Sequence, residues 1–520
     1  MNLLNVVIFL PLIGFLISIF IPKTNPGFSK LFALGFSIAI FALSLGLIEP
    51  FWFANPAGYV FETNVPWIDS PPIHYHMGLD GLSLWLVILT TLLTPLCVLI
   101  SWNYIDKRIR EFYAFLLLLE FGLVGVFCSL DLFLFYTFWE ICLVPMYFLI
   151  GIWGYARRIY AAVKFFLYTM AGSVLMLAAT IYLYNRSGTF DYPVILSMLQ
   201  SGKLVLSSTE SLWLFLAFFV AFAIKVPLFP LHTWLPDAHV EAPTAGSVML
   251  ASVMLKMGTY GLLRFCLPMF PGTARMCAVW IVPLAIIGIV YGALVAMVQP
   301  NMKKLVAYSS VSHLGFVVLG LFSFTQNGLD GAVYQMLNHG VTTGALFMLV
   351  GFLYERRHSL EISAYGGVAT PAPNLAKVFM IVMLASIGLP TLNNFIGEYL
   401  VLQGAAIANF SWAIFASIGV ILAAVYMLWL YQRTFLGKAT EELIHHMYDL
   451  KAREYFAIIP LVILMVWMGT FTQSFMPSIS ATNARILEPI EAKKEIQVRI
   501  VQPLSASVLS SSIKELANAH

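Results

Sequence analysis

Charged side chains are scarce in this chain. Asp, Glu, Lys and Arg make up 10% of its 520 residues, whereas average proteins contain about 25%. Hydrophobic residues make up 60%, and the mean hydropathy is +0.87. This composition excludes a soluble globular protein and indicates a membrane protein. The formal net charge of +3 is too small to indicate nucleic-acid binding, so we expect no nucleic-acid partner.

Cysteine is also rare. The five cysteines lie in or beside apolar segments, without a C-x-x-C pair or a Cys/His spacing typical of metal ligands. Such cysteines usually pack as small apolar side chains, so the sequence predicts neither a metal nor a cofactor in this chain. It also lacks a P-loop, a dinucleotide glycine fingerprint and a nucleophile elbow. We therefore do not expect the chain itself to hydrolyse nucleotides or to bind NAD.

Apolar runs of the roughly 20 residues needed to cross a bilayer dominate the chain. The first begins at Leu3 with no basic segment before it, which predicts a retained helix and not a cleaved signal peptide. Residues 49–79 are predicted to form a long loop rich in Pro and aromatics, and residues 475–520 a mixed polar tail without a span. The sequence predicts an all-α polytopic membrane protein with about fourteen transmembrane helices, at 3–21, 30–48, 80–102, 112–129, 132–152, 161–184, 212–234, 243–267, 277–298, 303–323, 331–354, 374–403, 411–435 and 454–474.

The basic residues predict the orientation of these helices. Seventeen of the 28 Lys and Arg residues fall in loops on one side, and four in loops on the other. Because basic loops stay on the cytoplasmic side, that first side is predicted to be cytoplasmic or its organellar equivalent. Both termini are then expected on the outer, periplasmic side of an energy-transducing membrane, either a bacterial inner membrane or an organellar one.

Two of the predicted helices are interrupted by proline. Helix 7 contains Pro227 and Pro230, and helix 12 contains Pro390 beside Asn393 and Asn394. Proline removes a backbone hydrogen bond, and in a membrane such breaks are tolerated only inside protein or beside water. Simple packing kinks are the alternative, but the polar side chains at both breaks favour a functional role.

The two breaks belong to a predicted internal repeat. Ala162-Val163 opens helix 6 and Ala332-Val333 opens helix 11, each before a similar polar-then-apolar pattern. Helices 4–8 and 9–13 are thus predicted to form two five-helix repeats, inverted because five is odd, as in many transporters. The corresponding divisions of the chain are 1–110, 111–268, 269–436 and 437–520.

Six ionisable residues lie within the apolar segments and are the principal candidates for chemistry. A charged side chain at the centre of a membrane helix costs about 2.5–3.5 kcal/mol, and such residues usually mark an ion or proton path. Glu140 and Lys225 are predicted to pair, with a static ion pair between two helices as the alternative. Lys256 has no acid nearby in its own helix, so we expect its partner elsewhere. The remaining candidates are His313, His339 and Glu398, the last expected toward the outer end as an exit group.

Each of these has an alternative reading. A lone helix histidine is often a satisfied core residue, Lys256 could be structural, and Glu398 could be a solvated helix-end carboxylate. Secondary candidates for the proton path, some of them flanking the predicted cytoplasmic mouth, are Glu120, Lys164, His232, Asp237 and His239. Anchoring to the cytoplasmic interface is the alternative for Lys164.

Two segments carry a specific resemblance. The run from Lys225 to Ser247, KVPLFPLHTWLPDAHVEAPTAGS, and the run from Asn301 to His313, NMKKLVAYSSVSH, resemble the antiporter-like subunits of respiratory complex I, which are related to Mrp-type cation/proton antiporter chains. The resemblance covers about residues 75–475 and implies fourteen helices, two inverted repeats and a polar axis at mid-membrane depth. Glu398, where sibling subunits typically carry Lys, is similar to the M-type (chain 4) members. A long C-terminal traverse helix is not expected.

The resemblance implies a proton-translocating membrane-arm subunit of an NADH:quinone oxidoreductase. Protons would enter near Lys256, His232 and His239, load Lys225 under the control of Glu140, and leave through Glu398. Its expected partners are sibling membrane-arm subunits and the lipid bilayer, and the redox chemistry is expected in other subunits. A subunit of an Mrp-type Na⁺/H⁺ antiporter and a structural membrane-arm scaffold are the alternatives.

Overall fold

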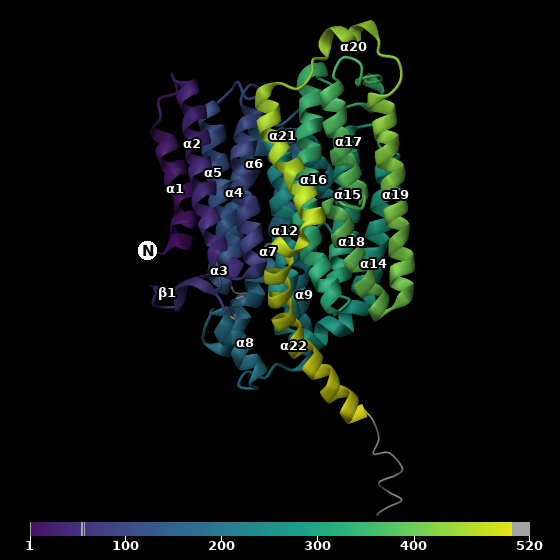
Figure 1. Cartoon of the computed structure of the whole chain (residues 1–520). Helices are drawn as coiled ribbons and strands as arrows, with labels where there is room; N and C mark the ends of the chain where they lie inside the picture. The colour runs from purple at the N-terminus through teal and green to yellow at the C-terminus, as the bar shows by residue number, and fades with distance from the viewer. Residues whose placement is uncertain (1, 54–55, 57, 502–520) are drawn as a thin grey trace, which may run out of the picture.

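The computed structural model describes residues 2–53, 56 and 58–501. Long helices stand side by side in one bundle (Figure 1). Thirteen of the described helices are long and apolar enough to cross a membrane. They are α1 (Leu3–Phe20), α2 (Pro26–Leu45, continuing to Trp52), α4 (Gly81–Ser101), α5 (Ile109–Cys128), α6 (Leu132–Trp153), α7 (Arg158–Ser187), α9 (Ser208–Lys225), Thr244–Met269, α14 (Pro271–Met297), α15 (Met302–Leu321), α16 (Gln326–Arg357), α19 (Phe410–Phe435) and α21 (Ala452–Thr470).

The predicted twelfth span is split in two. α17 (Pro373–Ile387) and α18 (Asn393–Ala408) are each shorter than a full span, and the break between them contains Pro390. Gly388 has φ +83° and Thr391 has φ +79°. The left-handed region suits glycine but strains a β-branched residue such as threonine. With this split helix, the prediction of about fourteen crossings is confirmed.

The predicted break in helix 7 is also confirmed. α9 ends at Lys225, and α10 (Trp234–Glu241) begins only after a turn that contains Pro227 and Pro230. The indole of Trp234 donates a hydrogen bond to the carbonyl of Ile224 at 2.9 Å. The side chain thus satisfies a carbonyl freed where the helix stops. The arrangement into two inverted repeats stays a prediction.

Residues 49–79 are not an irregular loop, so that prediction is wrong. They form α3 (Glu49–Phe53) and an antiparallel hairpin of β1 (Val60–Ile68) and β2 (Ile73–Leu79). The hairpin is fixed to the bundle by the backbone, because the amide of Leu130 donates to the carbonyl of His76 at 2.9 Å. This tertiary contact stabilises a pairing that the Pro-rich sequence did not suggest.

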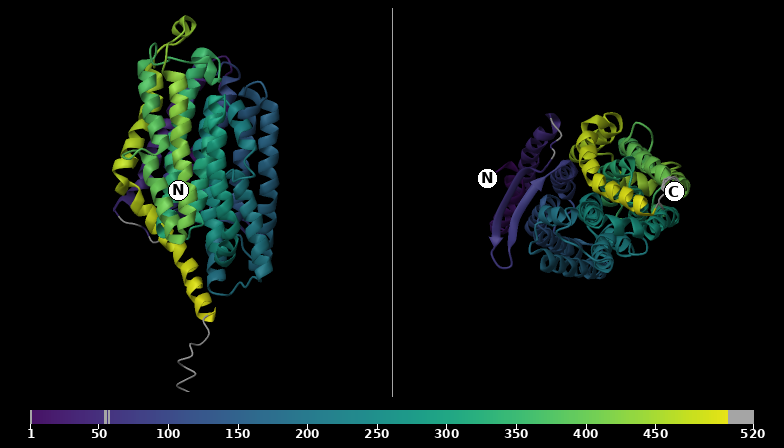
Figure 2. Two further views of the ribbon diagram at one scale, coloured as in Figure 1. Left: turned by 90° about the vertical axis from the view of Figure 1, so that its right-hand side faces the viewer. Right: turned by 90° about the horizontal axis from the view of Figure 1, so that it is seen from below.

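The C-terminal tail is likewise more ordered than predicted. Residues 476–501 form α22 (Met476–Val501), which packs on α4 and α16. Figure 2 shows this yellow helix extending beyond the end of the bundle. Asp330 accepts hydrogen bonds from Ser480 and Asn483, both at 2.8 Å. The polar residues of this segment therefore satisfy one another at a helix interface. Residues 502–520 of the predicted tail lie outside the described residues.

The two ends of the bundle differ. α20 (Glu441–His446) caps one end, while the hairpin, α8 (Tyr192–Gln200) and α22 lie at the other (Figure 1). The start of α1 also points to the hairpin end. The two ends of the described chain are therefore on the same side of the bundle.

Candidate functional site

Lys256 lies in an irregular part of the helix Thr244–Met269. This helix consists of α11 (Thr244–Met249), α12 (Leu255–Gly261) and α13 (Leu267–Met269), joined by π-helical segments at Leu250–Met254 and Leu262–Cys266. The wider π turn leaves carbonyls available, and Lys256 Nζ donates to the carbonyl of Ala251 at 2.6 Å. π-helical segments of this kind often mark functional sites.

Gly258 allows the broken helix 7 to approach this segment closely. A Cβ at Gly258 would lie 2.7 Å from the carbonyl oxygen of Phe222 and 2.9 Å from the amide of Val226. Any side chain there would therefore force α9 away from α12.

Four of the six principal candidates form one buried row. Lys256 Nζ lies 2.6 Å from His339 Nδ1, and His313 Nδ1 lies 2.9 Å from Glu398 Oε1. The two imidazole rings have centroids 5.9 Å apart. All four side chains are at most 4% exposed. They come from α12, α16, α15 and α18, so the row crosses four helices.

The carboxylate of Glu398 is held at the break between α17 and α18. Gln335 Nε2 donates to Glu398 Oε1 at 3.1 Å, in addition to the His313 contact. A Cβ at Gly388 would lie 3.1 Å from Glu398 Oε2. Glu398 is buried, so the alternative of a solvated helix-end carboxylate is wrong.

Amide side chains connect the break to α16. Asn338 Nδ2 donates to the carbonyl of Asn393 at 2.9 Å, and Asn393 Nδ2 donates back to the carbonyl of Asn338 at 3.2 Å. Gln335 also belongs to the site, although it was not among the residues predicted from the sequence. Its position one helical turn before His339 was the available signal, since residues four apart share a face.

The predicted ion pair between Glu140 and Lys225 is not formed in the described structure. Lys225 is completely buried at the end of α9, and its Nζ has no hydrogen-bond partner there. It lies 5.4 Å from the ring of Trp139 and 5.2 Å from that of Phe165. Glu140 and Lys225 act on each other electrostatically, but without contact. The aromatic faces, which attract a cation, take the place of the expected carboxylate, and the static-pair alternative is wrong as well.

The secondary candidates separate into different surroundings. Lys164 and Asp237 form an ion pair at 2.7 Å, which ties α7 to α10. His232 and His239 are buried, and within the described part of the chain none of their ring nitrogens is hydrogen-bonded. Glu120 is completely buried in α5 with neither carboxylate oxygen hydrogen-bonded there.

The row contains the groups that a proton relay needs. A lysine ammonium donates protons, a neutral imidazole accepts on one nitrogen and donates from the other, and a carboxylate accepts. Among residues 2–53, 56 and 58–501, no group of three or more His, Cys, Asp or Glu side chains could hold a metal ion. The Lys, His and Glu side chains of the row are thus groups of the kinds that can donate and accept protons in sequence.

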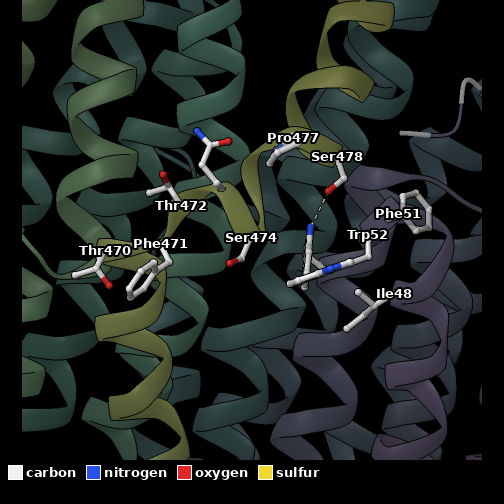
Figure 3. Close-up of a pocket in the computed structure, with 11 residues that line it drawn as sticks. Ile48, Phe51, Trp52, Thr470, Phe471, Thr472, Ser474, Pro477 and Ser478 are labelled. Carbon is white, nitrogen blue, oxygen red and sulfur yellow. Dashed lines mark hydrogen bonds between the residues drawn. The ribbon is translucent and has the colours of Figure 1, made fainter. Parts of the chain in front are cut away.

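A cavity of about 490 Å³ lies away from this row. It is lined by residues of α3, α4 and the α21–α22 connection, among them Trp52, Phe471 and Ser474 (Figure 3). Trp85 Nε1 donates to Ser478 Oγ across it at 2.9 Å. Among the described residues, no ionisable side chain lines this cavity, so it is not part of the charged row.

The chain matches a known family over more than half its length. Residues 129–424 match the family model described as NADH:quinone oxidoreductase/Mrp antiporter, TM. In fold, the chain is similar to a chain of respiratory complex I from Thermus thermophilus, with a TM-score of 0.85 and 32% identity over 94% of this chain and 100% of that one. A chain of the membrane-bound sulfane sulfur reductase, at 23% identity and a TM-score of 0.81, shares the fold.

Relatives of known type indicate to which subunit within this family the chain corresponds. NADH-quinone oxidoreductase subunit M of Rickettsia prowazekii (strain Madrid E) is 44% identical over 91% of this chain and 96% of its own length. NADH-quinone oxidoreductase subunit M of Rhodobacter capsulatus is 44% identical over 94% of this chain and 97% of its own length. NADH-ubiquinone oxidoreductase chain 4 of Arabidopsis thaliana is 40% identical over 93% of this chain and 97% of its own length. The chain therefore belongs to the subunit M/chain 4 family of NADH-quinone oxidoreductases, within the NADH:quinone oxidoreductase/Mrp antiporter family.

Proposed function

We propose that this chain carries protons across the membrane along Lys256, His339, His313 and Glu398. As a member of its family, it is a proton-translocating membrane-arm subunit of a complex I type NADH:quinone oxidoreductase, whose partners are the sibling membrane-arm subunits. Electron transfer to quinone takes place in other subunits, and the energy reaches this chain through its neighbours. We propose no redox site and no cofactor in the chain itself.

The observation that carries the proposal is the continuity of the row. Lys256 contacts His339 at 2.6 Å and His313 contacts Glu398 at 2.9 Å, both within reach of direct proton transfer. The rings of His339 and His313 have centroids 5.9 Å apart, and the Nε2 atom of each ring is buried without a partner in the described structure. A single water molecule accepting from one nitrogen and donating to the other completes the row.

Proton movement along the row conserves charge at each step. The Lys256 ammonium gives a proton to His339 Nδ1, and the imidazolium formed there releases its Nε2 proton toward His313. His313 then passes its Nδ1 proton to the Glu398 carboxylate. Lys225 loads the row under the electrostatic influence of Glu140, which acts on it without contact.

The orientation in the membrane is also part of the proposal. The basic loops lie on the inner side of a bacterial inner membrane or its organellar equivalent, and the two termini lie outside. Protons then enter near His232, His239 and the Lys164–Asp237 pair, and Glu398 is the exit group.

Replacing Lys256 by Met tests this function. Met has nearly the same length but carries no proton, so NADH-driven proton pumping in membrane vesicles is expected to fall by about 10²-fold or more, with the complex still assembled on a native gel. Lys377→Met, which changes an exposed lysine at the start of α17, is the matched control and should pump normally. Normal pumping by an assembled Lys256→Met complex refutes the proposal, and pumping that requires Na⁺ favours the antiporter function instead.

A further inference from the structure

Lys303 is a third lysine, after Lys225 and Lys256, that the described structure buries without an acidic partner in contact. It lies in the first turn of α15, its exposed fraction is 0%, and no ion pair involves it among the described residues. Its Nζ donates to the carbonyl of Ala242 at 2.7 Å and lies 4.6 Å from the ring of Tyr155. Lysine is almost never fully buried without pairing, so this position requires an explanation.

Lys303 lies where several loops between helices meet, at the end of the bundle that carries the basic loops. Ala242 follows α10, and Tyr155 lies between α6 and α7. The amide of Tyr155 donates to the carbonyl of Glu241 at 2.9 Å. The carboxylate of Glu241 is directed elsewhere, because its Oε2 accepts from the amide of Arg157 at 2.8 Å. Glu241 therefore does not neutralise the Lys303 ammonium by contact.

His239 connects this lysine to the buried row. It is completely buried in α10, its ring stacks on that of Phe347 with centroids 4.6 Å apart, and both ring nitrogens lack partners in the described part of the chain. α10 packs against α15 and is followed by Ala242, whose carbonyl accepts from Lys303 Nζ at 2.7 Å. His239 therefore lies one helical turn from the contact of the Lys303 ammonium, and its ring lies against α16, a helix that contributes to the buried row. The charges of Lys303 and Lys256 both act on this imidazole, which is placed to pass a proton from Lys303 toward the buried row.

We propose that Lys303 is the inner terminal group of the proton path and passes protons to His239. The ammonium of Lys303 gives one proton to a ring nitrogen of His239, which leaves a neutral amine and an imidazolium. The imidazolium then reloads Lys256 once that residue has released its own proton, and water on the inner side reprotonates the Lys303 amine. This inference rests on the proposed function and extends the row from four residues to six.

A structural role makes different demands on the side chain. If Lys303 only holds the start of α15 against the carbonyl of Ala242, any cation that donates to this carbonyl should serve. Arginine does so but cannot release a proton in a protein. The conservative variant Lys303→Arg therefore separates the two roles.

The test compares Lys303→Met, Lys303→Arg and Lys304→Met in the complete complex, in membrane vesicles. Lys304 lies next to Lys303 on α15 but is only partly buried, so Lys304→Met is the matched control. We expect both Lys303 variants to lose at least about tenfold in NADH-driven proton pumping in complexes that assemble normally, with the Lys304 variant unchanged.

Three results would overturn the inference. They are normal pumping by Lys303→Arg, equal losses at positions 303 and 304, and failure of both Lys303 variants to assemble, which would make the position structural. If the Lys303 variants pump normally while Lys256→Met does not, this inference fails and the proposed function stands. If only the Lys303→Met complex fails to assemble, the pumping rate of the Lys303→Arg complex tests the inference: loss of pumping supports it, and normal pumping overturns it.

Discussion

The buried ion pair between Arg356 and Glu454 stabilises the end of the bundle that α20 caps, and its contribution to stability can be predicted. Two bonds join the groups, at 2.7 and 2.9 Å, and the side chains are 0% and 1% exposed. Arg356 also donates to the carbonyls of Phe352, Tyr448 and Asp449 at 2.7, 2.8 and 3.3 Å. One guanidinium thus connects α16, α21 and the segment after α20.

Replacing Arg356 by Met leaves the carboxylate of Glu454 buried without its partner. Removing one member of a buried pair costs about 3–5 kcal/mol. Since about 1.4 kcal/mol corresponds to a factor of ten, local opening at the ends of α16 and α21 should become about a hundred- to a few thousand-fold more frequent. Hydrogen exchange of these amides in the purified complex measures this directly.

The neighbouring residue provides the control. Arg357 pairs with Glu442, whose side chain is 63% exposed, and exposed pairs contribute about 0–1 kcal/mol. Arg357→Met should therefore change exchange by less than about tenfold. The double variant Arg356→Met/Glu454→Leu should recover most of the lost protection, because an apolar pair can replace a buried ion pair. Equal effects at 356 and 357, or no recovery, would refute the reasoning.

Two further predictions concern the opposite end of the bundle. His76 is buried and bonds Asp191 at 2.6 Å and Glu62 at 2.8 Å; burial lowers its pKa, but these bonds outweigh burial and the pKa is raised. The stabilisation from the charged His76 is thus present below the usual histidine pKa and is lost as pH rises through the raised pKa of the folded state. Hydrogen exchange of the hairpin amides should therefore increase over this pH range by more than the intrinsic pH dependence of exchange. His76→Gln should remove that extra increase. Gly81→Ala places a Cβ in steric conflict with the carbonyl oxygen of Ser478 in α22. The substitution should weaken the docking of α22 by about 1–3 kcal/mol and speed proteolysis of α22, and unchanged proteolysis would contradict this.

Hydropathy and proline identified most of the fold from the sequence. Spans of about 20 apolar residues, and breaks at Pro227 and Pro390, follow from local rules that the bilayer enforces. The hairpin and α22 were missed because their stability depends on tertiary contacts. The bond from Leu130 to His76 and those from Ser480 to Asp330 join segments far apart in the chain.

The sequence identified most residues of the site, but it did not predict which of them contact one another. Buried charge singled out Lys256 and Glu398, but nothing in the sequence indicated which histidine each would contact. The expected pairing of Lys225 with Glu140 fails because aromatic rings surround the ammonium instead. Lys303 was not among the predicted site residues because it stands at the first position of the predicted span 303–323, and only the packing of the surrounding connections buries its side chain.

The central claim is that the buried row carries the protons that this chain moves. The most direct test is the number of protons pumped per electron by a complex carrying Glu398→Gln, an isosteric change that keeps a hydrogen-bonding group beside His313 and Gln335 but cannot accept the proton. Glu361→Gln, at an exposed carboxylate, is the control. The number of protons pumped per electron should fall in the assembled Glu398→Gln complex and not in the control, and an unchanged ratio at Glu398 would contradict a proton path through the row.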